Sequence, residues 1–264
     1  MRQSGRPGGF GKSTPVESQP PEVIAHRGGG GEAPENSWSS LAHVRALGIR
    51  VMETDVHMSA DGVAVLIHDP VVDRVLDGCG SVRDLRWEEL RGMLDAAGDP
   101  PVRLDEALTS YPEVIFNIDA KEDAAAGPLA RMAQRWPGRI RLASFSDARL
   151  RYIRSVNPAV ETSLGQVAVA QLVAASTAPG PVGQNLVRAS AARYAFAAQV
   201  PVRFGPITVV TRRFIRLCHR LDLAVHVWTI DEPAQMQQLA ALGVDGLITD
   251  YPRLALETLG RTLS

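Results

Sequence analysis

The chain has 264 residues, a formal net charge of -1, 45% hydrophobic residues and 22% charged residues, which is the composition of an ordinary soluble globular protein. This balance gives no argument for a nucleic-acid or membrane partner, and no apolar run approaches the roughly 18 residues that span a bilayer. Two cysteines, Cys79 and Cys218, form neither a disulfide framework nor a metal-binding spacing. Both are expected to be free thiols in a reducing, cytoplasmic compartment.

The beginning of the chain reads as a tail followed by a strand. Residues 1–21 are polar, rich in Gly, Ser and Pro, and lack the apolar core of a secretory signal, so a disordered tail is expected. Residues 22–264 are expected to form one domain. This domain opens with a short apolar strand at 22–25, which ends at His26.

Strand-like and helix-like patterns then alternate along the domain. Strands are expected at 22–25, 49–55, 63–67, 114–119, 139–144, 160–164, 195–200, 224–230 and 243–250. Helices are expected at 37–47, 87–94, 124–136, around 149–153, at 211–220, at 233–242 and from 252 onward. The alanine-rich stretch 167–178 and the region 179–193 are too weakly patterned to assign.

This alternation predicts the fold class. About eight strands separated by helices within roughly 240 residues favour an α/β protein with a (β/α)8 barrel over a doubly wound sheet. Active sites of such barrels lie at the carboxyl ends of the strands. Several polar or aromatic side chains fall at or near such ends and are expected to share one site: His26, Glu53, Asp55, Asp119, Lys121 and Trp228.

The segment 53–69 is the centre of the expected site. Glu53 and Asp55 stand two residues apart in a strand, so their carboxylates face one side. An Asp-Gly turn follows, and the next strand brings His68 back towards them. Two anionic oxygens suit a hard cation such as Mg²⁺ or Ca²⁺, and an imidazole beside them suits proton transfer near neutral pH. The alternative is that the carboxylates face solvent and His68 merely ends a strand.

Residues 70–103 make a longer connection than strands and helices of a barrel usually have. A small insertion over the barrel mouth is expected, with a helical piece at 87–94. Two roles for it remain open, the shaping of substrate access and the structural covering of the barrel's edge.

Several short motifs stand in an order that resembles a known family. They are His26-Arg27-Gly28, Pro34-Glu35-Asn36-Ser37, the segment 53–69, Asn117-Ile118-Asp119-Ala120-Lys121, Val227-Trp228-Thr229 and Gly246-Leu247-Ile248-Thr249-Asp250. In type and spacing they resemble the glycerophosphodiester phosphodiesterase family, from residue 22 to about 255. The resemblance implies a (β/α)8 barrel with a modest insertion after the second strand, and an enzyme that is a phosphoric diester hydrolase.

The resemblance also implies a cofactor. Glu53 and Asp55 match the family's paired ligands for one divalent cation, Mg²⁺ or Ca²⁺. The third ligand is usually a glutamate in an N-x-E-x-K pattern, and this chain has Asp119 at that position. The side chain is shorter by one methylene, so the cation must shift or a water molecule must bridge.

The remaining roles follow from the same resemblance. His26 and His68 match the two acid–base histidines, Arg27 and Lys121 the cations that contact phosphate, and Trp228 an aromatic wall beside the substrate's alcohol. The implied reaction is metal-dependent hydrolysis of a glycerophosphodiester to glycerol 3-phosphate and an alcohol, with the glycerol 2-hydroxyl as first nucleophile. The expected partner is this small substrate and no nucleic acid. Which histidine acts first as base stays open, as does the oligomeric state.

Two other interpretations stand beside this one. A related phosphodiesterase acting on lysophospholipids stays open, because apolar residues occur in the insertion. A catalytically inactive barrel serving as a binding module is disfavoured, because both histidines and all three carboxylates are present. His57, His219 and His226 are expected to be structural, and Asp245 and Asp250 to be ordinary loop acids.

Overall fold

The computed structural model describes residues 20–177 and 195–261, so the expected disordered tail falls outside it except for its last two residues. Within this part, one sheet has ten strands, of which β3 (Ala64–Leu66) and β4 (Val102–Arg103) run antiparallel to their neighbours. The other eight are parallel: β1 (Glu22–His26), β2 (Val51–Met58), β5 (Ile115–Ala120), β6 (Ile140–Ala143), β7 (Glu161–Ser163), β8 (Ala195–Pro201), β11 (Ala224–Trp228) and β12 (Gly246–Thr249).

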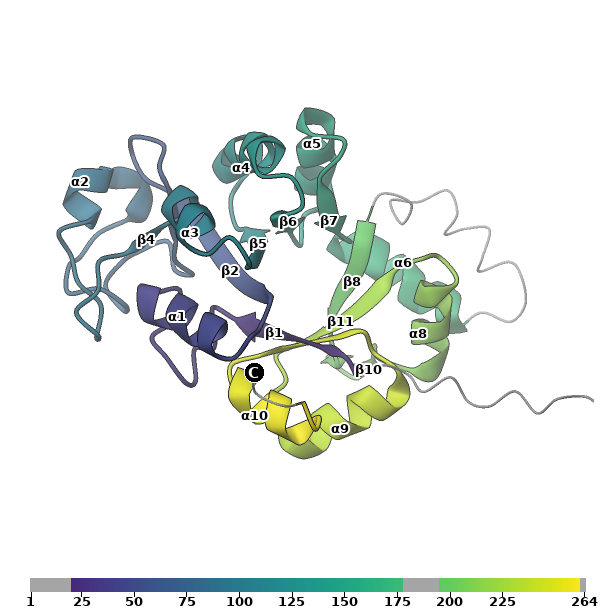
Figure 1. Cartoon of the computed structure of the whole chain (residues 1–264). Helices are drawn as coiled ribbons and strands as arrows, with labels where there is room; N and C mark the ends of the chain where they lie inside the picture. Colours follow the sequence, from purple (N-terminus) through teal and green to yellow (C-terminus); the bar gives the residue numbers. More distant parts are fainter. Residues whose placement is uncertain (1–19, 178–194, 262–264) are drawn as a thin grey trace, which may run out of the picture.

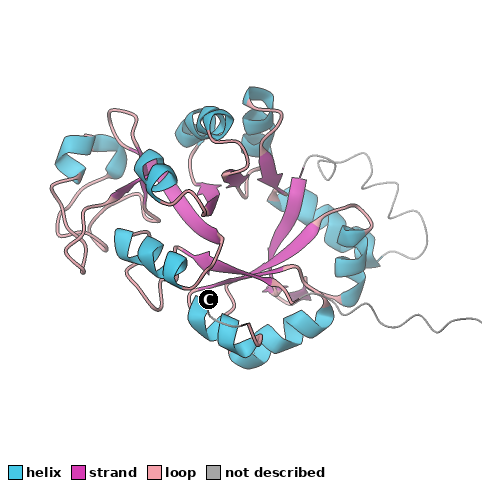
Figure 2. Ribbon diagram, viewed as in Figure 1, coloured by secondary structure: helices cyan, strands magenta, loops and turns pink. Residues whose placement is uncertain are grey.

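The parallel strands close into a barrel through β1. In register, Ile24 of β1 is paired with Val51 of β2 on one side and with Ile248 of β12 on the other. The predicted (β/α)8 barrel is therefore confirmed, and Figure 2 shows its strands enclosed by helices. Because the strands are parallel, their carboxyl ends lie at one end of the barrel, which we call the mouth.

The helices form the outer layer in Figure 1, and most of the predicted bounds agree closely with the structure. The helices are α1 (Trp38–Ala46), α2 (Trp87–Leu90), α3 (Leu104–Ser110), α4 (Asp123–Arg135), α5 (Asp147–Val156), α6 (Gln166–Thr177), α8 (Arg212–His219), α9 (Pro233–Leu242) and α10 (Pro252–Thr258). The helix expected at 87–94 ends earlier, at Leu90. The unassigned stretch 167–178 lies almost wholly in α6, whose pattern is faint because its small residues are apolar on every side.

Local chemistry fixes where individual helices begin and end. At the start of α1, the Ser37 hydroxyl accepts a hydrogen bond from Ser40 N at 3.0 Å, and the Ser40 hydroxyl accepts one from Ser37 N at 3.1 Å. This reciprocal cap satisfies backbone donors that the helix itself cannot pair. Helix α9 begins at Pro233 and ends at Gly243, whose φ of 90° lies in the left-handed region that glycine adopts without strain.

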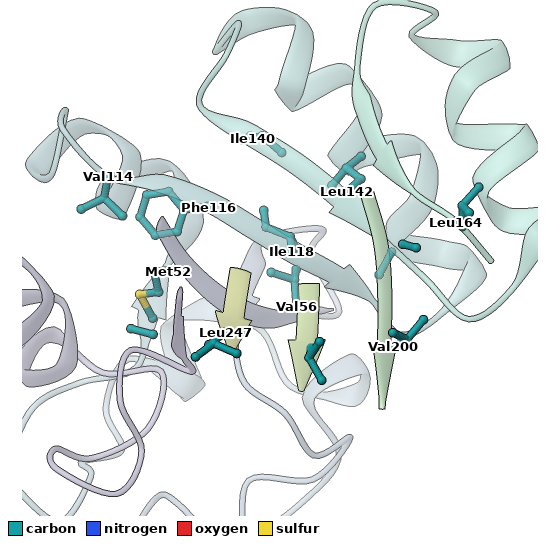
Figure 3. Close-up of a cluster of buried hydrophobic side chains, with 14 of the residues drawn as sticks. Met52, Val56, Val114, Phe116, Ile118, Ile140, Leu142, Leu164, Val200 and Leu247 are labelled. Atoms are coloured by element: carbon teal, nitrogen blue, oxygen red, sulfur yellow. The ribbon is translucent and has the colours of Figure 1, made fainter. Parts of the chain in front are cut away.

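Two apolar layers lie on the two faces of the barrel strands. The outward layer packs under the helices, and Figure 3 labels members from several strands, including Met52, Val56, Phe116, Ile118, Leu142 and Val200. A separate cluster of Ile24, Val51 and Ile248 belongs to the interior. Because side chains alternate along a strand, Glu53 and Asp55 share the interior face with Val51.

A polar network also crosses the barrel interior. Gln199 Nε2 lies 3.2 Å from Asn117 Oδ1 and 3.4 Å from His226 Nδ1. The His226 ring is buried and lies edge-on to Phe196, at a centroid distance of 5.6 Å. Burial, with the nearby charge of Arg141, lowers the pKa of His226 to about 4. The imidazole is therefore neutral at pH 7 and packs as part of the interior.

Because the pKa of His226 is lowered in the folded chain, we expect the protein to lose stability in acid. The unfolded chain protonates His226 near a pKa of about 6.5, whereas the folded chain does so only near pH 4. Between these values the unfolded state binds more protons, so the free energy of unfolding falls by about 3 kcal/mol as the pH is lowered. His226→Asn, which keeps an acceptor for Gln199 and cannot titrate, is expected to flatten this pH dependence in urea denaturation. An unchanged slope would assign the loss to other groups.

The connection between β2 and β5 contains the insertion. Strand β3 pairs antiparallel with the carboxyl end of β2, where Val56 is the register partner of Leu66, and β4 pairs with β3. A short 3-10 helix (Val82–Asp84) and α2 follow β3. The insertion has its own apolar cluster of Val65, Ile67, Val72, Val82 and Leu90. In Figure 1, α2 stands outside the ring of helices, at the edge of the molecule.

The states of the two cysteines and the lengths of the helices agree with what the sequence predicted. Cys79 is exposed and Cys218 is buried, and both are free thiols as predicted. Burial, with the charge of Asp245, raises the pKa of the Cys218 thiol to about 12, so it packs as an uncharged group. Among the helices of the described ranges, none is both long and apolar enough to cross a membrane.

Candidate active site

Three carboxylates face the barrel interior near the mouth. Glu53 and Asp55 come from β2 and Asp119 from β5, where Asp55 and Asp119 are register partners. Their exposed fractions are only 9%, 2% and 9%. Ionised carboxylates this close and this far from water repel one another, so the cluster requires positive partners.

Lys121 supplies one positive charge to the cluster. Its Nζ lies 2.8 Å from Asp55 Oδ1 and 2.9 Å from Asp119 Oδ2. Burial by itself would lower the pKa of Lys121, but the two carboxylates outweigh burial and raise it. Burial raises the pKa of Asp119, and Lys121 offsets part of that rise. The ammonium thus bridges the two strands as a permanent charge.

Of the three carboxylates, Glu53 has its negative charge least balanced by nearby positive groups. Burial, together with the charges of Asp55 and Asp119, raises the pKa of Glu53 to about 8. Its Oε2 accepts a hydrogen bond from Arg27 N at 3.3 Å and lies 3.8 Å from His26 Nε2. A carboxyl group perturbed this strongly in a polar cluster is characteristic of a functional site.

His26 ends β1 and lies between two carboxylates. Its Nδ1 is 2.7 Å from Asp250 Oδ1, while its Nε2 faces Glu53. Burial lowers the pKa of His26, but the hydrogen bond to Asp250 and the charges of both carboxylates outweigh burial and raise it. Asp250 is fixed in turn by Asp231 Oδ1, which accepts from Asp250 N at 2.9 Å and from the Thr249 hydroxyl at 3.0 Å.

Asp250 is therefore a residue that the sequence analysis missed. It was expected to be an ordinary loop acid, and the structure instead places it as the partner that orients His26. The available signal was its position, since Asp250 directly follows the last residue of β12 and so stands at the carboxyl end of a barrel strand, like His26 at the end of β1.

His68 is oriented by a neighbouring carboxylate in the same way. Its Nδ1 lies 2.6 Å from Asp69 Oδ1, and Asp69 also accepts a hydrogen bond from Arg74. Arg74 donates two more bonds, at 2.7 and 3.0 Å, to the Glu35 carboxylate. The Arg74 bond lowers the pKa of Asp69 to about 2. His57 Nε2 lies 3.2 Å from the His68 carbonyl oxygen, which is the structural role expected for it.

Arg27 joins the carboxylate cluster to the loop that follows β1. Its Nη1 donates to Glu35 at 3.3 Å, and its Nε lies 3.4 Å from Asp55 Oδ2. The turn that aims it needs glycine next, because Gly28 has a φ of 80° and a Cβ there would meet the Ser40 hydroxyl oxygen at 2.4 Å. Glu35, bonded by guanidinium groups on both sides, links the surroundings of His68 to the carboxylates.

Trp228 ends β11 and packs against the interior cluster that contains Ile24 and Val51. Phe145, in the loop after β6, lies edge-on to its ring, with centroids 5.9 Å apart and planes at 86°. Phe145 is 58% exposed. The sequence analysis named Trp228 but not its aromatic neighbour Phe145, because an isolated Phe in a loop carries no pattern; we call the two rings the aromatic wall.

The donor set of the cluster has the chemistry that a divalent cation requires. Carboxylate oxygens are the ligands that Mg²⁺ and Ca²⁺ prefer. Asp55 Oδ2 is buried without a hydrogen-bond partner, and Glu53 lacks a full counter-charge. Within residues 20–177 and 195–261, however, no group of three or more His, Cys, Asp or Glu side chains stands in a ready metal-binding arrangement. The Lys121 ammonium instead bridges Asp55 and Asp119.

The mouth of this barrel combines buried carboxylates, two cationic side chains and two imidazoles paired with aspartates, a set of groups that suits acid–base chemistry on an anionic ester. The model of the glycerophosphoryl diester phosphodiesterase family matches residues 26–254. The chain is also 33% identical over 241 residues to "Probable glycerophosphodiester phosphodiesterase 2" of Mycobacterium tuberculosis, which covers 90% of each protein. The chain belongs to the glycerophosphoryl diester phosphodiesterase family and is a phosphoric diester hydrolase.

Other relatives agree over nearly the full length. A glycerophosphodiester phosphodiesterase of Caldanaerobacter subterraneus is 27% identical over 247 residues, which cover 87% of this chain and 94% of that protein. A phosphodiesterase of Oleispira antarctica, solved in complex with the product sn-glycerol-3-phosphate, superposes with a TM-score of 0.72 at 20% identity. That match covers 91% of this chain and 97% of the other, and it supports the same barrel fold.

Proposed function

We propose that the chain hydrolyses glycerophosphodiesters to glycerol 3-phosphate and an alcohol, with one divalent cation and two acid–base histidines. The observation that carries this proposal is the contact set at the mouth, where three carboxylates, two cations and an oriented imidazole meet within hydrogen-bonding or ion-pair distance: Glu53, Asp55, Asp119, Arg27, Lys121 and His26. Family membership and the product held by the Oleispira antarctica structure support it.

Arg27 and Lys121 bind the non-bridging oxygens of the phosphodiester. Both side chains already reach Asp55, at 3.4 and 2.8 Å, so they stand on either side of one carboxylate. Positive groups held in place before the reaction stabilise the negative charge that develops at phosphorus. The ion pairs with Asp55 hold Arg27 and Lys121 in the position for phosphate binding when no substrate is bound.

Glu53, Asp55 and Asp119 hold the divalent cation, which stays a choice between Mg²⁺ and Ca²⁺. A cation held there would supply positive charge that stabilises the anionic phosphate. The Asp55 oxygen that lacks a hydrogen-bond partner and the uncompensated Glu53 are the protein groups that gain most from it. Asp119 shares its carboxylate between this role and the bond to Lys121.

His26 and His68 transfer the protons. Because each Nδ1 faces an aspartate, each Nε2 remains for the substrate. One imidazole takes the proton of the glycerol 2-hydroxyl as its oxygen attacks phosphorus, and the other protonates the alcohol whose bond to phosphorus breaks. The cyclic phosphate is then opened by water with the two histidines in exchanged roles. Trp228 lies beside the alcohol part of the substrate.

Asp119 gives a direct test of the ligand set. Asp119→Glu lengthens the carboxylate by one methylene, so it reaches a cation without leaving Lys121, and the affinity for Mg²⁺ is expected to rise about tenfold. Asp119→Asn removes the charge at nearly constant volume and is expected to weaken binding. Titration calorimetry of both variants measures the two affinities. Equal affinities in the wild type and both variants would exclude Asp119 from the cation's ligands.

A lysophospholipid is the second candidate substrate. The specific observation in its favour is the aromatic wall, since Phe145 exposes most of its ring beside Trp228. The insertion adds partly buried apolar residues, such as Leu76 and Trp87, around its own cluster. An acyl chain would cover such surface, whereas the polar head groups of deacylated lipids would not.

The deciding experiment is an assay of glycerol 3-phosphate release from glycerophosphocholine. Metal-stripped protein is compared with protein given Mg²⁺, Ca²⁺ or Mn²⁺, with Glu113→Gln as a control for a surface carboxylate paired to an arginine. Metal-dependent release is expected. Cleavage of a lysophospholipid alone would select the second candidate, and no turnover of either would overturn the proposal. A cytoplasmic location stays a prediction.

A further inference from the structure

The acidic residues of this chain are distributed unevenly. Of its 29 Asp and Glu residues, none lies between Glu161 and Asp222. Within this interval the described residues 195–221 hold five arginines: Arg203, Arg212, Arg213, Arg216 and Arg220. The net charge of -1 for the whole chain therefore hides a strongly basic segment beside an acidic remainder.

Helix α8 displays most of these arginines on one surface. Its inward face buries Phe214, Ile215, Leu217 and Cys218. Arg212, Arg213, Arg216 and Arg220 are all exposed. Elsewhere arginines pair with acids, as Arg45 does with Glu113 and Arg149 with Asp123, but within the described residues no ion pair engages the arginines of this segment.

The hairpin just before α8 exposes an apolar pair. Strands β9 (Arg203–Phe204) and β10 (Ile207–Thr208) are joined by Gly205 and Pro206. Phe204 and Ile207 are register partners, so their side chains stand on the same face of the ribbon. They are 63% and 51% exposed, which is unusual for large apolar side chains at a hairpin tip.

Topology places the hairpin at the barrel mouth. It follows the carboxyl end of β8, and Thr211 caps the start of α8 directly after it. Other exposed apolar residues also lie in segments that leave the carboxyl ends of strands: Phe145 after β6, Val167 after β7 and Tyr251 after β12. Several exposed apolar residues of the described chain therefore lie in segments that begin at the end of the barrel that carries the candidate active site.

We propose that the β9–β10 hairpin and the exposed face of α8, together called the basic face, dock the barrel mouth onto an anionic phospholipid surface. The exposed arginines without ion pairs complement acidic lipid head groups. The Phe204–Ile207 pair of the hairpin is large enough to insert its apolar side chains into the head-group region of the membrane. A nucleic acid would also be attracted by the arginines, but it would leave the exposed Phe204–Ile207 pair without an apolar contact. The docking would present the active site to substrates released from, or still held in, a membrane.

The test is co-sedimentation of the full chain with vesicles of phosphatidylcholine, with or without phosphatidylglycerol, at low and high salt. Binding is expected only to the anionic vesicles, and salt is expected to weaken it. Arg212→Gln/Arg213→Gln is expected to reduce binding about 25-fold, since each surface charge contributes about fivefold. Phe204→Ser/Ile207→Ser is expected to reduce it at least about tenfold. Arg131→Gln/Arg135→Gln on α4 makes the same charge change elsewhere and should leave binding unchanged.

The outcomes separate docking from folding and from catalysis. The basic-face variants should hydrolyse a water-soluble phosphodiester at the wild-type rate, because none of these residues belongs to the active site. No binding to anionic vesicles, equal binding to neutral ones, or equal loss in the α4 control would overturn the proposal. Salt-sensitive binding of single-stranded DNA without vesicle binding would assign the basic face to nucleic acid instead.

Discussion

Replacing His26 by asparagine is expected to lower kcat for glycerophosphocholine by about a thousandfold, the usual contribution of a general acid or base. The asparagine amide can still donate to Asp250, so the end of β1 should keep its position while the proton-transferring Nε2 is lost. His68→Asn is expected to cause a loss of similar size. His43→Asn is the matched control. His43 lies on α1, its Nε2 is 2.6 Å from Glu32 Oε2, and it is not one of the proposed active-site residues.

A second substrate then assigns the two roles. A glycerophosphodiester with a p-nitrophenyl leaving group needs no proton on departure, so the variant that lacks the acid of the first step should recover on it. The variant that lacks the base should stay slow with both substrates. Stopped-flow measurement of p-nitrophenolate release gives the first step alone. Wild-type rates in both variants on glycerophosphocholine would exclude the histidine pair from catalysis.

Replacing Glu53 by glutamine is expected to have opposite effects on stability and on activity. In the absence of metal, Glu53 is buried beside Asp55 and Asp119, and its pKa is raised to about 8. At neutral pH the folded chain must therefore hold a proton on Glu53 that the unfolded chain does not hold, which costs stability. The amide is uncharged in both states, so Glu53→Gln should raise the free energy of unfolding by roughly 3 kcal/mol. The same change removes a ligand, so added Mg²⁺ or Ca²⁺ should no longer raise the melting temperature, and hydrolysis should be lost.

Thermal denaturation with and without metal measures both parts of this prediction. Glu113→Gln serves as control, because Glu113 is an exposed partner of Arg45 and has no neighbouring carboxylate in the site. If Glu53→Gln destabilised the metal-free protein, the raised pKa would not reflect a real electrostatic cost. If the metal still raised the melting temperature of the variant to the full extent, Glu53 would not be a ligand.

Sequence patterns were sufficient where the chemistry is local. The alternation of β2, the Asp-Gly turn and the cap at Ser37 all depend on near neighbours, so the start of α1 and the return of the chain along β2 could be predicted. Helix α6 could not, because periodicity needs polar residues to mark its outer side and this stretch has almost none.

Long-range partners were the second kind of omission. Asp250 is separated from His26 by 224 residues, and only the closing of the barrel brings them together. Arg74 lies in the insertion and meets Glu35 from the first loop, a contact that no spacing encodes. Sequence analysis therefore identified groups that act on substrate in the resembling family but missed most of the groups that hold them in place.

The pairing of the first strand with the last has a consequence for how the enzyme is made. His26 leaves the ribosome 224 residues before its partner Asp250, and β1 leaves it well before its neighbouring strand β12. A nascent chain that ends before β12 has an open sheet edge along β1 and a histidine without its orienting carboxylate. A chain shortened before β12 is therefore expected to be inactive, even though it contains every residue proposed here to touch phosphate or metal.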